Sequence, residues 1–346
     1  MDKNYCMSHF LAFRYIKDEN RNFYAGLRHK VHKPRPGSEI LPVRTIEDID
    51  GIIREKIARF FIPGKTAVLL SGGQDSAILA SYLPPGTKAY TFKCLAPGAI
   101  DETAQAAKYA AAYSLDHEII PIEWSDFEEL SSEICRFDGV PFHSIEVQLV
   151  KAARHAKRQG IERLVIGESS DLVFGGMDKL LSQDWDFDSF VKRYIFCPPP
   201  AALKESVDVT EFFEPYRLPG GKIDFLRFMD EVFAHESSSS YMHAFEMENI
   251  EYLDPYSYMK MSEPLDLRRV RNGEPKYLIR ELFAKRYPQI PVPDKIPMPR
   301  AMNQWLAGWT GPVRPEFIPG CQENMTGDQK WLVWILEKFL SLHEKA

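Results

Sequence analysis

The chain has 346 residues, of which 45% are hydrophobic and 12% aromatic, and it carries a formal net charge of −6 at pH 7. This length and apolar content allow one large domain or two smaller ones with a substantial buried core. The negative net charge gives no general attraction to phosphate backbones, and no dense cluster of lysine and arginine offsets it. We therefore expect no nucleic-acid partner.

Cysteine usage and hydropathy indicate a protein of a reducing compartment. The cysteines are Cys6, Cys94, Cys135, Cys197 and Cys321. Their odd number and wide separation argue against a disulfide framework and against a zinc ribbon. No run approaches the roughly 20 apolar residues that a membrane span requires, and the first ten residues carry no long apolar stretch. We therefore expect a cytoplasmic protein with no membrane partner.

Residues 1–45 contain two short runs with aromatic side chains, at residues 9–16 and 22–27, separated by a polar, turn-like segment. This pattern predicts a small β-hairpin. From Thr45 to Phe61, apolar residues recur at spacings of three and four, which is typical of an amphipathic helix. This helix is expected to lead into the first strand of the main domain.

Strand and helix signals then alternate along the chain. Strands are predicted at residues 66–70, 88–93, 117–122 and 162–166, and helices at residues 75–83, 101–115 and 144–159. Alternation of this kind favours an α/β fold, in which a parallel sheet is covered by helices on both faces. Ligands of such sheets bind at the carboxyl ends of the strands.

After about Met177 the strand signal fades and helical segments dominate. Helices are predicted at residues 222–236, 275–287 and 328–344, with Pro-rich connections between some of them. We therefore divide the chain into three parts. They are a short N-terminal β segment (1–45), an α/β core that binds ATP (46–177) and a helical lobe that completes the substrate site (178–346).

A serine- and glycine-rich loop joins the first predicted strand of the core to the helix that follows it. The loop consists of Ser71, Gly72, Gly73, Gln74, Asp75 and Ser76. Two adjacent glycines let the backbone approach a ligand closely, and exposed N–H groups ahead of a helix form a site for phosphate or pyrophosphate. A glycine turn that binds nothing is the alternative. The combination of strand, paired glycine, acid, serines and helix favours the phosphate site.

The SGGxDS pattern of this loop resembles the loop of the ATP-pyrophosphatase group. This group includes asparagine synthetases, GMP synthetases, NAD synthetases and several tRNA-modifying enzymes, and its members cleave ATP between the α and β phosphates. The resemblance implies a fold of the adenine nucleotide alpha hydrolase-like kind, with ATP as the cofactor.

A second motif directly follows the strand predicted at residues 162–166 and narrows the family. Residues 167–176 resemble the GEGSDELFGG segment of asparagine synthetases and β-lactam synthetases. The matching positions are Gly167, Glu168, Ser170, Asp171, Phe174, Gly175 and Gly176. Ser169 stands where the family has a glycine, and Leu172 stands where it has an acid.

The two carboxylates of this motif, Glu168 and Asp171, are suited to catalysis. Three residues apart after a parallel strand, they can supply one ligand for Mg²⁺ and one general base. The alternative for Asp171 is a plain helix N-cap. Asp101 and Glu102 fall where the synthetases have another acidic pair, although a favourable position at a helix start explains them equally well.

A third stretch, from Glu251 to Arg280, resembles the family's later signature, in which a PFLD segment precedes a helix with a lysine. Here residues 252–254 read YLD, and Lys276 matches the lysine. In isolation Lys276 would be a solvated surface residue. The resemblance implies that it points into the site and stabilises charge on the reacting acyl phosphate. The family's arginine just before PFLD has no counterpart here.

Together the three motifs imply one site. ATP is expected to contact Leu70, Ser71, Gly72, Gly73, Asp75, Ser76, Phe92 and Gly167. Asp75 and Asp171 are the expected ligands of Mg²⁺. Glu168 is the expected general base, and Lys276 is the expected stabilising cation.

The resemblance spans Thr45 to Lys295 and implies an ATP-dependent, AMP-forming carbon–nitrogen ligase. Such an enzyme adenylates a substrate carboxylate, releases pyrophosphate and transfers the acyl group to ammonia or an amine. Glutamine-using members carry an N-terminal amidotransferase domain with a cysteine nucleophile at the processed N-terminus, where this chain has Asp2. We therefore expect no glutaminase domain. Ammonia from solution, ammonia from a separate glutaminase, or an amine of a second substrate would then be the nitrogen donor.

Two other functions stay open. The first is a tRNA-modifying ATP pyrophosphatase, which the acidic charge and the scattered cysteines disfavour. The second is a non-catalytic nucleotide-binding subunit, which the joint presence of the four charged motif residues disfavours. The sequence identifies neither the small-molecule carboxylate nor the oligomeric state.

Overall fold

The computed structural model describes residues 2–177, 179–294 and 298–344. At its centre lies a five-stranded sheet with the order β4-β3-β2-β5-β8, in which all neighbouring strands are parallel. The strands are β2 (Thr66–Leu69), β3 (Lys88–Cys94), β4 (Asp116–Ile122), β5 (Arg163–Val165) and β8 (Glu251–Leu253). The predicted α/β fold with a parallel sheet is confirmed. Lys295, where the family resemblance ends, lies outside the described residues.

Both faces of the sheet are covered, because successive residues of a strand point to opposite sides. In β2, Ala67 and Leu69 belong to one hydrophobic core and Val68 to the other. The core around Val68 contains α2 (Ile46–Phe60), α3 (Gln74–Ala80), α4 (Thr103–Ala112) and α13 (Tyr277–Arg286). The core on the opposite face contains α5 (Trp124–Asp138), α6 (Ile145–Arg158) and α11 (Ala234–Glu248).

Local capping fixes where α2 begins and where α5 ends. α2 starts as predicted after Thr45, whose side chain accepts the N–H of Asp48 while the Asp48 carboxylate accepts the N–H of Thr45. Helix α5, at residues 124–138, was not predicted from the sequence. α5 ends at Gly139, whose φ of 73° is the left-handed conformation that glycine adopts readily at helix ends.

The predicted N-terminal hairpin is wrong. Residues Lys3–Phe13 form helix α1, and residues 22–27 form no helix or strand. Every residue from Cys6 to Phe13 is buried, so this part of the helix has no exposed polar face. Periodicity cannot distinguish such a run from a buried strand. The strand that the structure describes in this region, β1 (Leu41–Val43), pairs in parallel with β9 (Met259–Met261).

The C-terminal half is mainly helical, as predicted, but it also completes the sheet. Strand β8 comes from this half, and its three residues are too few to show the alternation that identifies a strand. The predicted helix at residues 222–236 is divided into α10 (Phe225–Phe228), a π-helical turn (Met229–Phe233) and the start of α11. The division of the chain at Met177 stays a prediction.

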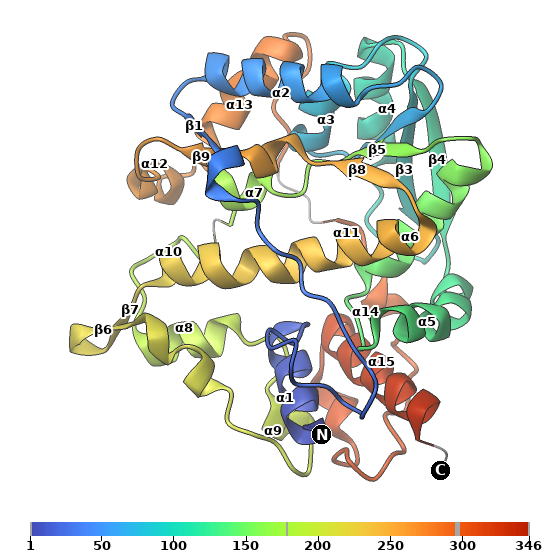
Figure 1. The fold of residues 1–346 in the computed structure, drawn as a ribbon, viewed down its shortest axis with the longest axis vertical. Helices are drawn as coiled ribbons and strands as arrows, with labels where there is room; N and C mark the ends of the chain where they lie inside the picture. Colours follow the sequence, from blue (N-terminus) through green and yellow to red (C-terminus); the bar gives the residue numbers. More distant parts are fainter. Residues whose placement is uncertain (1, 178, 295–297, 345–346) are drawn as a thin grey trace.

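Helix α11 crosses the middle of the molecule, between the sheet with its upper helices and a lower part made largely of helices (Figure 1). The lower part contains α1, α8 (Phe187–Tyr194), α9 (Pro199–Ala202), α14 (Met302–Trp305) and α15 (Gly327–His343). The N-terminal segment runs from α1 up to α2 at the top of the view. The remaining short elements are α7 (Ser170–Val173), α12 (Leu267–Arg271), β6 (Arg217–Leu218) and β7 (Lys222–Ile223). Among the described residues, none of the helices combines the length and apolar character of a membrane span.

Candidate active site

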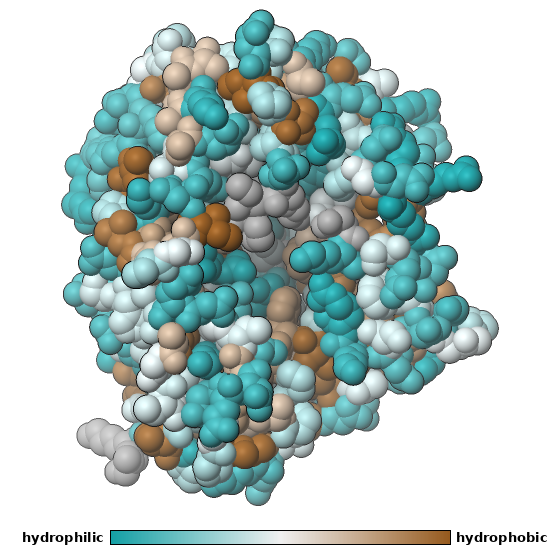
Figure 2. Space-filling model, turned by 180° about the vertical axis from the view of Figure 1, so that it is seen from behind, coloured by the Kyte–Doolittle hydropathy of each residue, from teal (hydrophilic) through white to brown (hydrophobic). Residues whose placement is uncertain are grey.

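A cavity of about 710 Å³ lies at the carboxyl ends of β2 and β5. Its wall includes residues of the loops that follow these two strands and residues of α8 and α11. Figure 2 shows a hollow near the middle of one face of the molecule, bordered by both hydrophilic and hydrophobic residues. The carboxyl ends of the strands are where a parallel α/β fold binds its ligands.

Most of the residues predicted to act at the site meet at this cavity. Leu70, Ser71, Ser76, Phe92, Gly167, Glu168 and Asp171 line it. Gly72, Gly73 and Asp75 belong to the same loop as Ser71 and Ser76 but are not part of the wall. The prediction therefore selected neighbouring residues, and their roles stay predictions.

The Ser71–Ser76 loop is held in a tight turn by its own side chains. The Ser71 N–H donates to Ser76 Oγ at 2.9 Å, and the Gly73 N–H donates to Ser71 Oγ at 3.1 Å. Glu102 packs on this loop, because a Cβ atom added to Gly72 would lie only 2.8 Å from Glu102 Cβ. Burial raises the pKa of Glu102 to about 7. The close approach of Glu102 therefore requires glycine at position 72.

Lys276 forms an ion-pair cluster with two carboxylates that lie far apart in the sequence. Its Nζ lies 2.6 Å from Asp75 Oδ2, and it also pairs with Asp171 Oδ1. Ser170 Oγ donates to Asp75 Oδ1 at 2.6 Å. Burial lowers the pKa of Lys276, but the two carboxylates outweigh this effect and raise it overall. The ammonium group therefore stays charged at neutral pH.

The structure places Lys276 behind the cavity wall rather than on it. The side chain is 5% exposed, and its backbone has a left-handed conformation (φ 54°) immediately before α13. Its ammonium group bridges the two predicted Mg²⁺ ligands. Two carboxylates and one ammonium leave one negative charge, and carboxylate oxygens are ligands that Mg²⁺ prefers. The cluster therefore fits a divalent cation in charge and in donor type.

Because Gly176 has no side chain, there is room beside it for the ion-pair cluster of Lys276, Asp75 and Asp171. A Cβ atom at this position would lie 2.0 Å from Asp171 Oδ1 and 2.2 Å from Lys276 Cε, so any side chain would displace both groups. We expect Gly176→Ala to lower kcat/KM of the reaction proposed below about 10²-fold, the effect of a displacement of about 1 Å in a catalytic site. Gly308→Ala is the control, because nothing lies within 4 Å of a Cβ atom there. Equal activity of the two variants would contradict the role of Gly176.

Glu168 lies on the cavity wall, where serine hydroxyls hold it. Its Oε2 accepts hydrogen bonds from Ser169 Oγ at 3.2 Å and from Ser238 Oγ of α11 at 3.1 Å. Burial raises the pKa of Glu168 to about 7, and the nearby Asp254 carboxylate acts in the same direction. A carboxylate with a pKa near neutrality is suited to accept and release protons.

Asp254 directly follows β8 and connects the third motif to the other two. Its Oδ2 accepts the Ser169 N–H at 2.8 Å, and its Oδ1 accepts the Tyr256 N–H at 3.1 Å. The Tyr256 hydroxyl in turn donates to the backbone oxygen of Asp75 at 3.0 Å. Burial raises the pKa of Asp254 to about 6. The carboxyl ends of β2, β5 and β8 are thus joined by hydrogen bonds.

A second group of wall residues, centred on Arg14, was not predicted from the sequence. This residue ends α1 with a left-handed backbone (φ 64°), and its Nη1 lies 2.6 Å from His143 Nε2. Its Nε lies 2.7 Å from Glu236 Oε1, and its guanidinium lies 3.5 Å from the centre of the Phe196 ring. Burial lowers the pKa of His143 well below its usual value, and Arg14 adds to the effect. No local pattern marks these residues, because they come from separate segments that only the fold brings together.

Ser238 was missed for the same reason. It lies in a run of four serines that matches no motif, and its contact with Glu168 depends on the placement of α11.

A parallel α/β sheet with a Ser-Gly-Gly loop after one strand and paired carboxylates after a neighbouring strand is an arrangement typical of nucleotide-binding proteins. The profile of the family described as asparagine synthase matches residues 63–244, which is more than half of the chain. The chain therefore belongs to the asparagine synthase family, a family of ATP-dependent, amide-forming ligases. The matched region contains the first two motifs and ends before Asp254 and Lys276. No curated protein matched the chain.

Proposed function

We propose that the protein is an ATP-dependent ligase that activates a small-molecule carboxylate as an acyl adenylate and converts it to an amide. The observation that carries this proposal is the convergence of the three motifs. The Ser71–Ser76 loop, Glu168 and Asp171 line one cavity, and hydrogen bonds and ion pairs tie Asp254 and Lys276 to them. A protein that only binds a nucleotide has no evident need for a carboxylate of raised pKa beside such a cluster.

The nucleotide would lie along the wall formed by the loops after β2 and β5. Backbone N–H groups and hydroxyls of the Ser71–Ser76 loop would hold the pyrophosphate part of ATP. Leu70, Phe92 and Gly167 lie on the same wall and would contact the nucleoside. Asp75 and Asp171 would hold Mg²⁺, which when bound offsets the negative charge of the triphosphate.

The reaction would take two steps. In the first, a substrate carboxylate oxygen bonds to the α-phosphorus of ATP, and the bond from that phosphorus to the pyrophosphate oxygen breaks. In the second, the nitrogen of ammonia or an amine bonds to the acyl carbon, the bond to the AMP oxygen breaks, and Glu168 takes the surplus proton from nitrogen. Lys276 would keep the cluster of carboxylates oriented and reduce its negative charge. The products are an amide, AMP and pyrophosphate.

Positive side chains on the wall favour an acidic acceptor. Arg14, Lys179, Arg193 and Arg300 line the cavity. Arg14 is paired with Glu236 and Arg300 with Asp328. Arg193 has no ion pair with any residue that the structure describes, so its guanidinium is available to bind a carboxylate. We therefore propose Arg193 as a binding group for the substrate carboxylate.

A pyrophosphate-release assay with MgATP and ammonium tests the function. Aspartate and a panel of other small carboxylates would be supplied, AMP would be measured alongside, and Asp171→Asn would serve as the inactive control. We expect AMP and pyrophosphate in equal amounts with one acceptor class, and loss of both in the variant. Formation of ADP would contradict adenylation. Salt-sensitive binding of RNA, or tight ATP binding without turnover across the whole panel, would favour the two alternatives.

A further inference from the structure

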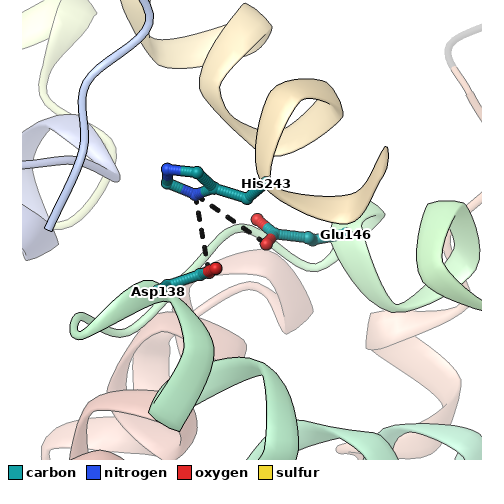
Figure 3. A group of neighbouring side chains, drawn as sticks. All are labelled: Asp138, Glu146 and His243. Atoms are coloured by element: carbon teal, nitrogen blue, oxygen red, sulfur yellow. Dashed lines mark ion pairs between the residues drawn. The ribbon is translucent and has the colours of Figure 1, made fainter. Parts of the chain in front are cut away.

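Three buried side chains that do not line the large cavity point toward one another (Figure 3). Asp138 is the last residue of α5, Glu146 lies in the first turn of α6, and His243 lies in α11. His243 Nδ1 lies 3.5 Å from Asp138 Oδ2 and 3.9 Å from Glu146 Oε1. One ligand atom from each residue lies within 4.8 Å of the other two.

Among the described residues, His243 is the cationic group that faces these two carboxylates. The side chain of Asp138 is 0% exposed and that of Glu146 is 2% exposed. Both carboxylate oxygens of Asp138 and the Oε1 of Glu146 accept no hydrogen bond within the described part of the chain. Neither residue forms an ion pair there with lysine or arginine. A protonated His243 offsets at most one of the two buried negative charges, so a bound divalent cation would stabilise the arrangement further.

There is room for one small ion beside these groups. A cavity of about 20 Å³ is lined by all three side chains. Such a volume exceeds the roughly 10–15 Å³ that one water molecule occupies. Two cationic residues also line this cavity, but Arg14 is paired with Glu236, and the ammonium of Lys30 is paired with Glu246. Neither of them neutralises the two carboxylates.

His243 is oriented as a metal ligand. Its Nε2 lies 3.0 Å from the Lys30 carbonyl oxygen, so Nε2 carries a proton and donates it, and Nδ1 faces the carboxylates. Burial lowers the pKa of His243, but Asp138 outweighs this effect and raises it overall, so a metal ion would bind at Nδ1 in place of a proton. One imidazole nitrogen with two carboxylate oxygens suits Zn²⁺ better than Mg²⁺ or Ca²⁺, which prefer oxygen alone. Ligand atoms around a tetrahedral zinc ion with bonds of about 2.0–2.1 Å lie about 3.3–3.4 Å apart. The closest nitrogen–oxygen pair of this group, at 3.5 Å, has nearly this spacing.

We propose that Asp138, Glu146 and His243 bind one divalent transition-metal cation, with Zn²⁺ the best match to these donors. The two carboxylates balance its charge. The ion would join α5, α6 and α11, and α11 also carries Ser238, which donates to Glu168. Its role is structural, because it fixes α11 and thereby the position of Ser238. This site is independent of the ligase reaction proposed above.

The competing arrangement is a proton shared between Asp138 and Glu146 beside a protonated His243. Burial raises the pKa of Glu146 well above its usual value, and the charge of Asp138 acts in the same direction, as such a proton would require. A shared proton needs no metal. Metal content therefore separates the two arrangements.

The test uses the full chain without ATP, so that its result does not depend on ligase activity. The protein is stripped with a chelator, returned to Zn²⁺, freed of excess ion by gel filtration and analysed by mass spectrometry for metals. We expect a single zinc ion per chain, a Tm several degrees higher than that of the stripped protein, and visible absorption bands when Co²⁺ replaces Zn²⁺. Protein that retains neither Zn²⁺, Co²⁺ nor Mn²⁺ would overturn the proposal in favour of the shared proton.

Variants identify the ligands. Asp138→Asn combined with Glu146→Gln keeps the shapes of the side chains and removes the buried charges, so this double variant should fold and lose the ion. His9→Gln is the matched control, because His9 is another buried histidine and does not line this small cavity. This control should retain the ion, as should Asp171→Asn. Zinc retained by the double variant would refute the assignment of these ligands.

Discussion

Replacing Lys276 by methionine is expected to remove most ligase activity and to destabilise the fold. The variant leaves Asp75 and Asp171 facing each other without the ammonium that now lies between them. Removing one partner of a fully buried ion pair costs about 3–5 kcal/mol; because these carboxylates are partly exposed, we expect about 2–4 kcal/mol. We expect kcat to fall about 10²–10³-fold, as when one stabilising donor is removed from an active site. Denaturant unfolding and the pyrophosphate-release assay measure the two effects.

Lys285→Met is the matched control for this prediction. Lys285 lies in the helix that Lys276 precedes, but its side chain is 52% exposed and its partner Glu47 is 67% exposed. Losing such a surface pair should change the free energy of unfolding by about 1 kcal/mol at most and leave kcat unaltered. Adding Asp75→Asn to Lys276→Met should recover part of the lost stability, because it removes one uncompensated charge. If Lys276→Met changes the free energy of unfolding and kcat no more than Lys285→Met does, the cluster contributes neither to stability nor to activity.

Glu168→Gln is expected to separate activity from stability. The amide cannot take a proton from the attacking nitrogen, so kcat should fall about 10²–10⁴-fold, the usual contribution of a general base. The amide oxygen can still accept from Ser238, so we expect no loss of folding. The folded-state pKa of Glu168, about 7, is above its ordinary value of 4.5, so folding favours the protonated form. Protonated Glu168 therefore stabilises the folded state fully below about pH 4.5, and this stabilisation is lost as the pH rises through about 7. In Glu168→Gln this pH dependence of the free energy of unfolding should be absent.

The pH dependence of kcat gives a second measure of Glu168. A base must be deprotonated to act, so the wild-type rate should rise through about pH 7 and level off above it. Ser238→Ala removes a hydrogen bond that favours the charged carboxylate, and it should therefore move this rise to higher pH without abolishing the plateau. A profile that is the same in wild type and Ser238→Ala would argue against Glu168 as the titrating base.

Except for α5, which was not predicted, the elements between Ile46 and Val165 could be predicted from the sequence because each of them carries its own local signal. Strand β2 is a short buried run, and α2 shows helical spacing with a cap at Thr45. Helix α1 and strand β8 escaped prediction for physical reasons. Helix α1 is buried nearly all round, so no periodicity reveals it, and β8 contributes only three residues to the sheet.

The site could be predicted only as far as its contiguous motifs extend. The Ser71–Ser76 loop and Glu168 were found because the residues of each motif follow one another in the chain. Ser238 and Arg14 carry no such pattern, because tertiary packing alone brings α11 and the end of α1 to the cavity. Family resemblance pointed to Lys276, yet it did not foresee that the ammonium would bridge Asp75 and Asp171.

The left-handed backbones of Arg14 and Lys276 exclude these two positions from one strategy for raising the thermal stability of a protein, substitution by glycine. Replacing a residue at positive φ by glycine can stabilise a fold, because a side chain with a Cβ costs about 1–2 kcal/mol of backbone strain in this conformation. At these two positions, with φ of 64° and 54°, the same change would delete the charges that organise the cavity wall and the carboxylate cluster. Ser114 and Asn249, also at positive φ, lie outside the cavity wall and are the better places for such substitutions.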